Sequence, residues 1–167
     1  DIHVQDQAVP PHVADKTFQD VIALSTAPVI ASHSSARAID KHPRNMTDDM
    51  MKALAGNGGV IQINFEVSFL SEENRLAQEK GGGVVAALDR MSTQCKGDEA
   101  CSTLETARIT REAMQKGTLP TVSWEAIVDH IDHAVKVAGI DHVGLGSDFD
   151  GATMPFGMED ASKLPKL

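Results

Sequence analysis

The sequence predicts an α/β fold in which parallel strands alternate with flanking helices. Segments with the apolar spacing of a helix take turns along the chain with short apolar runs rich in β-branched residues. These runs lack the period-two alternation of a sheet with one solvated face, so we expect strands that are buried on both sides. The 167 residues, 41% of them hydrophobic, are enough for one domain with a hydrophobic core.

The first part of the chain is predicted to hold two pairs of helix and strand. "DKTFQDVIALS" has helical spacing after Asp15, a candidate N-cap, and the strand 28–32 follows it. Thr47 is expected to cap the next helix, which is acidic in its first turn and ends at the glycines of 56–59. The strand 60–65, "VIQINF", comes next.

Residues 70–122 interrupt this alternation, because they are long, highly charged and broken by "GGG" and a cysteine loop. The pattern resumes with an amphipathic helix over 123–139 and the strand "HVGLGSD". We therefore predict a single domain over residues 1–167 with a helical insertion at about 70–122.

Charge and hydropathy argue against nucleic acid as a partner and against a transmembrane segment. The formal net charge is −9, from 24 acidic and 15 basic residues, which leaves no basic stripe for nucleic acid. No apolar run approaches the roughly 18 residues of a transmembrane segment, and the N-terminus lacks the layout of a signal peptide.

The two cysteines, Cys95 and Cys101, lie six positions apart in a polar stretch. This spacing suits a small disulfide, but two free thiols fit the sequence equally well. A disulfide would need an oxidising compartment, which favours a periplasmic or extracellular location over a cytoplasmic one and leaves the compartment itself open.

Polar residues stand where two of the predicted strands end. His33 follows the first strand in "SHSSARA", and Asp148 ends the last one in "GSDFDG". In parallel α/β folds, catalytic residues gather at the C-terminal ends of the strands. We therefore expect chemistry at this edge of the sheet.

These residues and their surroundings resemble the membrane (renal-type) dipeptidases, zinc metallopeptidases with a (β/α)8 barrel. The motifs "SHSSARA", "HPRN", "GGVIQINF" and "GIDHVGLGSDFDG" occur in the order and roughly the spacing of that family. The resemblance covers about residues 12–65 and 123–167 and implies the C-terminal half of such a barrel. It implies hydrolysis of dipeptides by a hydroxide that bridges two zinc ions.

The resemblance also implies a role for four residues. His12 and His33 match zinc-binding histidines, Arg44 matches the arginine that holds the substrate carboxylate, and Asp148 matches the acidic residue that carries a proton to the leaving amine. The chemistry is suitable, since neutral imidazole binds zinc and the fork of arginine pairs with a carboxylate. A carboxylate beside a metal can take and return a proton.

Other candidates have simpler interpretations. His130 and His133 have a helical i, i+3 spacing, but they match a helix outside the family's barrel, so we expect structural histidines. We interpret His42 as a bystander and Asp150 as a turn residue. No glycine-rich stretch has the spacing of a phosphate loop.

Part of the family's site has no match in this chain. In that family a His-x-Asp pair at the end of the first strand holds the first metal, and a glutamate from a middle strand bridges both metals. We find neither in this chain. A whole barrel takes about 250 residues, so the chain can supply only about half of one. We expect at most one zinc ion per chain, and either an N-terminal half supplied elsewhere or a homo-oligomer that covers the exposed strand edges. The alternative functions are a non-catalytic dipeptide-binding or scaffold remnant, or another barrel amidohydrolase.

Overall fold

The structure, a computed structural model, describes residues 15–81 and 94–167. These residues form two compact units. The first contains the described residues up to Asn64 together with Ile127–Ser147, and the second contains those of Phe65–Ala126 together with Asp148–Leu167. The prediction of one domain with an insertion at about 70–122 stays a prediction.

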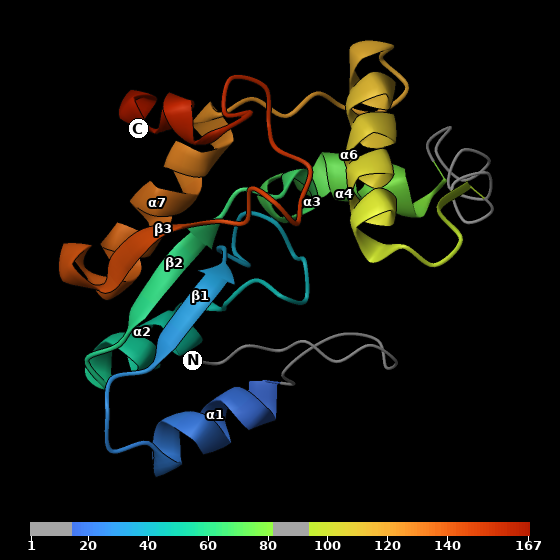
Figure 1. The fold of residues 1–167 in the computed structure, drawn as a ribbon. Coiled ribbons are helices and arrows are strands. Elements are labelled where there is room, and N and C mark those ends of the chain that lie inside the picture. Colours follow the sequence, from blue (N-terminus) through green and yellow to red (C-terminus); the bar gives the residue numbers. More distant parts are fainter. Residues whose placement is uncertain (1–14, 82–93) are drawn as a thin grey trace. The chain divides into compact units, whose positions relative to one another are not determined.

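The first unit is built on a parallel sheet with the strand order β1-β2-β3 (Figure 1). Ile30 of β1 pairs with Val60 of β2, and Ile61 of β2 pairs with Val143 of β3. Because the strands are parallel, their C-terminal ends lie at one edge of the sheet. The strands are β1 (Ile30–Ser34), β2 (Val60–Asn64) and β3 (Val143–Ser147).

The helices of the first unit begin and end close to the predicted positions. The Thr47 hydroxyl accepts a hydrogen bond from the Met50 backbone N–H at 3.2 Å, which confirms it as the N-cap of α2. Asp15 was expected as an N-cap, but it is the first residue of α1 and its carboxylate binds Arg37 instead. The elements are α1 (Asp15–Leu24), α2 (Asp48–Gly56), α7 (Glu125–Ala138), whose first two residues belong to the second unit, and η1 (Ile140–His142).

The core of the first unit lies between the sheet and its helices. Ile61 and Ile63 of β2 are fully buried, as are Met51 of α2 and Ile127 and Ala134 of α7. Burying one large aliphatic side chain stabilises a fold by about 1.5–3 kcal/mol. This core holds the strands of the first unit in place.

The second unit is largely helical. Its buried side chains include Val67, Phe69 and Leu70 from the segment after β2 and Met114 from the longest helix. Among the described residues of the chain, no helix is both long and apolar enough to span a bilayer. The elements of this unit are α3 (Val67–Leu70), α4 (Glu72–Glu79), α6 (Glu99–Gln115) and η2 (Ala161–Lys166).

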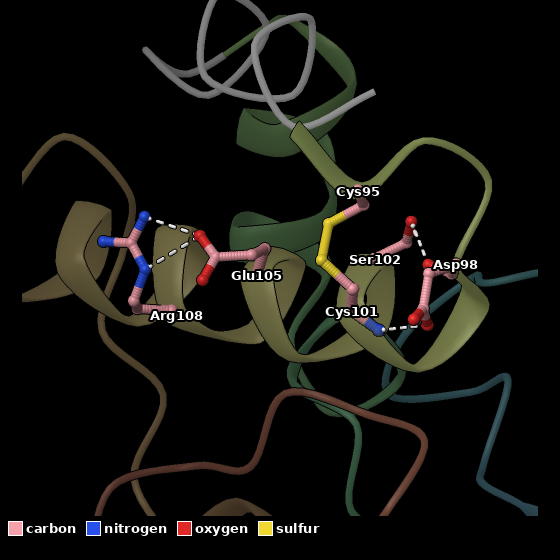
Figure 2. The surroundings of a disulfide bond; sticks show 6 residues. All are labelled: Cys95, Asp98, Cys101, Ser102, Glu105 and Arg108. Carbon is pink, nitrogen blue, oxygen red and sulfur yellow. Dashed lines mark hydrogen bonds and ion pairs between the residues drawn. A yellow bond between two sulfur atoms is a disulfide. The ribbon is translucent and has the colours of Figure 1, made fainter. Parts of the chain in front are cut away.

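A disulfide joins Cys95 to Cys101 at the start of α6 (Figure 2). Of the two states that the sequence left open, the structure therefore has the bridged one. The Asp98 carboxylate caps the same helix, since it accepts a hydrogen bond from the Cys101 backbone N–H at 3.0 Å. The bridge and the cap together close the first turn of α6.

Candidate functional site

The end of β1 brings together two of the predicted site residues. A guanidinium nitrogen of Arg44 lies 2.8 Å from Nε2 of His33, and the hydroxyl of Ser32 lies 3.0 Å from Nδ1 of the same ring. His33 is half-buried and Arg44 is exposed. The contact joins the C-terminal end of β1 to the loop that carries Arg44.

This geometry determines the tautomer of His33. A guanidinium carries only donors, so Arg44 donates to Nε2, and that nitrogen carries no proton. Nδ1 then carries the proton and donates a hydrogen bond to the hydroxyl oxygen of Ser32. A neutral imidazole with an unprotonated Nε2 is the form that binds a metal, and a partner on the other nitrogen is the usual way to orient such a ligand. The donor chemistry of His33 therefore fits zinc.

The loop that carries Arg44 is anchored by buried polar groups. The carbonyl of Arg44 accepts a hydrogen bond from the Ser34 hydroxyl at 2.9 Å, and its N–H donates to Nδ1 of His42 at 3.1 Å. Asn45 is fully buried, and its side chain donates to the carbonyl of Asp40 at 2.9 Å. His42, expected to be a bystander, thus supports the backbone of Arg44.

Asp148 lies in the second unit, directly after the last residue of β3. Its backbone is left-handed, with φ 75°, and Ser147 before it has φ 43°. Such a conformation costs a non-glycine residue of order 1–3 kcal/mol and is typical of functional sites. Gly151 closes the turn by donating its N–H to the Asp148 carbonyl at 3.1 Å. A Cβ at position 151 would lie only 2.6 Å from Oδ1 of Asp148, so any larger residue there would displace this carboxylate.

Glu66 is a second carboxylate in the second unit, and the sequence analysis missed it. It lies two residues after β2 and accepts hydrogen bonds from the backbone N–H groups of Thr153 and, at 3.3 Å, Ser68. Burial raises the pKa of Glu66, the two backbone donors oppose the rise, and the negative charge of nearby Asp148 adds to it. Its signal in the sequence was one acidic residue in the apolar stretch "INFEVSFL".

The two histidines of α7 make the structural contacts that were expected. His130 is fully buried, and its Nδ1 accepts a hydrogen bond from the Ala36 backbone N–H at 2.9 Å. Nε2 of His133 lies 2.7 Å from a carboxylate oxygen of Asp48 in the first turn of α2. The i, i+3 pair therefore joins α7 to two other parts of the first unit.

The predicted residues thus fall into separate groups. His33 and Arg44 touch each other in the first unit, whereas Asp148 belongs to the second unit with Glu66. The prediction for His12 lies outside the described residues. Over residues 15–81 and 94–167, no group of three or more histidines, cysteines and acidic residues is arranged to hold a metal ion.

Solved structures that share the fold include a metallopeptidase, a probable dipeptidase and an amidohydrolase. One from Rhodobacter sphaeroides, liganded with a phosphinate mimic of the dipeptide L-Ala-D-Ala, matches 92% of this chain and 32% of its own, with 32% identity and a TM-score of 0.61. A probable dipeptidase from Pseudomonas aeruginosa matches 90% of this chain and 40% of its own, with 30% identity and a TM-score of 0.64. An amidohydrolase from the same species shares the fold at 19% identity and a TM-score of 0.58. The chain has the fold of a metallopeptidase and forms part of a TIM-type barrel, as predicted.

Within this class, the chain belongs to the membrane dipeptidase family, peptidase family M19, whose sequence profile matches residues 10–167. An uncharacterised dipeptidase of Schizosaccharomyces pombe is 38% identical over 93% of this chain. An uncharacterised Klebsiella pneumoniae protein is 31% identical, also over 93%. The chain spans 27% and 42% of the lengths of these two relatives.

Proposed function

We propose that this chain contributes the zinc-binding histidines, the substrate arginine and the proton carrier of a zinc-dependent dipeptidase. The observation that carries the proposal is the 2.8 Å contact between Arg44 and Nε2 of His33. It brings a candidate metal ligand together with a candidate binding group for the substrate carboxylate at the C-terminal end of β1. A dipeptide has its scissile carbonyl one residue from its free carboxylate, so a receptor beside the metal position suits this substrate.

Each residue has a defined task in this proposal. His33, held by Ser32, and His12 would hold zinc, which when bound polarises a carbonyl and lowers the pKa of a coordinated water. Arg44 would leave His33 and bind the terminal carboxylate of the substrate through two parallel hydrogen bonds. Asp148 would carry a proton to the leaving amine.

Some groups of the complete site would come from outside this chain. The chain covers less than half of each solved relative. The family's ligands for the first metal, the His-x-Asp pair, have no match in its sequence. A second zinc ion would therefore require an N-terminal half, or a second copy in a homo-oligomer. The disulfide supports an oxidising compartment for the protein, periplasmic or extracellular.

Metal content and substrate choice test the proposal together. We would measure zinc per chain by elemental analysis after zinc loading and desalting, in the unchanged chain, in His33→Ala and in His133→Ala as a matched histidine control. About one equivalent that is lost only in His33→Ala is expected. Equal zinc in all three proteins would refute the assignment of His33.

Binding and hydrolysis of alanyl-alanine and of its C-terminal amide would then separate the alternatives. A dipeptidase requires the free carboxylate, whereas another barrel amidohydrolase would tolerate the amide. A binding remnant would retain the dipeptide through Arg44 without hydrolysing it and without zinc. Hydrolysis of the amide at the rate of the acid would contradict the dipeptidase proposal.

A further inference from the structure

The Arg37 side chain hydrogen-bonds to the loop that contains Arg44. Arg37 lies three residues after β1, and its side chain is only 23% exposed. Its Nε donates to the carbonyl of Asn45 at 2.7 Å, and its Nη2 donates to the carbonyl of Pro43 at 2.8 Å. These two carbonyls belong to the residues on either side of Arg44. One guanidinium therefore donates hydrogen bonds to the backbone on both sides of Arg44, the candidate substrate-binding arginine.

The loop backbone has its carbonyls fully engaged around this point. The backbone N–H of Arg37 donates to the carbonyl of Met46 at 2.8 Å, and the hydroxyl of Ser34 donates to that of Arg44 at 2.9 Å. Four consecutive carbonyls, 43 to 46, thus accept hydrogen bonds, and three of them accept from Arg37.

An ion pair holds Arg37 itself in place. Its Nη1 and Nη2 each lie 3.0 Å from a carboxylate oxygen of Asp15, the first residue of α1. The Asp15 side chain is 53% exposed, so this pair adds little to stability by itself. The planar fork of arginine can serve the carboxylate and both carbonyls at once, whereas the ammonium of lysine cannot match that geometry.

We propose that Arg37 is a positioning residue for Arg44 and thereby a determinant of selectivity for substrates with a free carboxylate. The inference rests on the proposed function, in which Arg44 binds that carboxylate. Bidentate pairing needs a guanidinium in a defined orientation, and a displacement of about 1 Å is enough to weaken such a contact severely. Arg37 fixes the peptide groups from which Arg44 projects.

The test compares binding of alanyl-alanine with binding of its C-terminal amide, by calorimetry on the zinc-loaded chain. Arg37→Lys keeps the positive charge but loses the planar guanidinium. We therefore expect alanyl-alanine to bind about tenfold more weakly and binding of its C-terminal amide to change little. Asp15→Asn, the matched control, leaves both carbonyl contacts in place and is expected to retain the preference. Arg44→Ala should remove the preference altogether.

Each outcome decides between the two ideas. Loss of preference in Arg44→Ala but not in Arg37→Lys would overturn the role of Arg37 and leave the proposed function standing. An unchanged preference in Arg44→Ala would overturn both. Equal weakening of acid and amide in Arg37→Lys, with a lower unfolding midpoint, would show a purely structural role and overturn the inference.

A second measurement is independent of ligand binding. ¹⁵N relaxation of the backbone amides of residues 44–47 reports how well the loop is ordered. We expect lower order parameters in Arg37→Lys than in the unchanged chain or in Asp15→Asn. Order parameters that are the same in all three proteins would overturn the inference even if neither dipeptide bound.

Discussion

Replacing His130 by alanine is expected to destabilise the chain by about 3–5 kcal/mol. His130 is 0% exposed, and its Nδ1 accepts the hydrogen bond of the equally buried Ala36 N–H at 2.9 Å. Leaving a buried N–H without its acceptor costs about 1–3 kcal/mol. The cavity left by the ring adds about 2 kcal/mol, toward the lower end for large-to-small core substitutions.

Two further variants separate these contributions. His130→Asn places an amide oxygen near the position of Nδ1, so it should recover about 1–3 kcal/mol relative to alanine. His133→Ala, on the same helix, removes a side chain that is 25% exposed and is expected to cost less than about 1 kcal/mol.

The assay is urea unfolding followed by circular dichroism, with the free energy of unfolding obtained by linear extrapolation. The expected order of stability is His133→Ala, then His130→Asn, then His130→Ala. Equal stability of the two His130 variants would refute the role given to the hydrogen bond. A cost below about 1 kcal/mol for His130→Ala would refute the whole account of this histidine.

Three other predictions follow from the same contacts. The pKa of Glu66 is raised in the folded chain, so its carboxyl contributes stability below its ordinary pKa of 4.5 and loses this contribution as the pH rises through the folded pKa. The stability of the unchanged chain relative to Glu66→Gln should therefore fall as the pH rises above 4.5 and then level off, and a difference in urea unfolding that does not depend on pH would contradict this. Reducing the Cys95–Cys101 disulfide should lower the free energy of unfolding by about 2 kcal/mol, because the bridge closes a short loop. The stability of a Cys95→Ser, Cys101→Ser variant should not respond to the reductant, and an unchanged unfolding midpoint of the original chain on reduction would contradict the prediction. Arg44→Ala should tighten zinc binding about threefold in competition with a chelating dye, since the guanidinium no longer occupies Nε2 of His33, and weaker binding would argue that Arg44 assists the metal.

Much of the local structure was predictable because it depends on neighbours in the sequence. The Thr47 cap, the end of α2 at Gly56 and the amphipathic helix α7, in which Ile127 and Ala134 are buried, follow from spacing and capping chemistry. The family resemblance in "SHSSARA" and "GSDFDG" likewise lies in contiguous residues. The strand ends that carry His33 and Asp148 were predicted for the same reason.

The residues that the sequence analysis missed act across long separations. Arg37 was read only as part of a motif, although it joins Asp15, 22 positions earlier, to the loop around Arg44. Glu66 accepts from Thr153, 87 positions away, and His130 from Ala36, 94 positions away. A charge or a histidine in the sequence does not reveal its partner when the partner is this far along the chain.

The sequence by itself determined the α/β class, the order of helices and strands and the family motifs, because periodicity, capping and contiguous motifs are properties of short stretches. Only the tertiary structure decided that His33 holds an unprotonated Nε2 toward Arg44, that Glu66 lies close to Asp148, and that the cysteines are bridged. Hydrogen bonds and charge interactions act over a few ångströms, and folding alone determines which distant residues come that close.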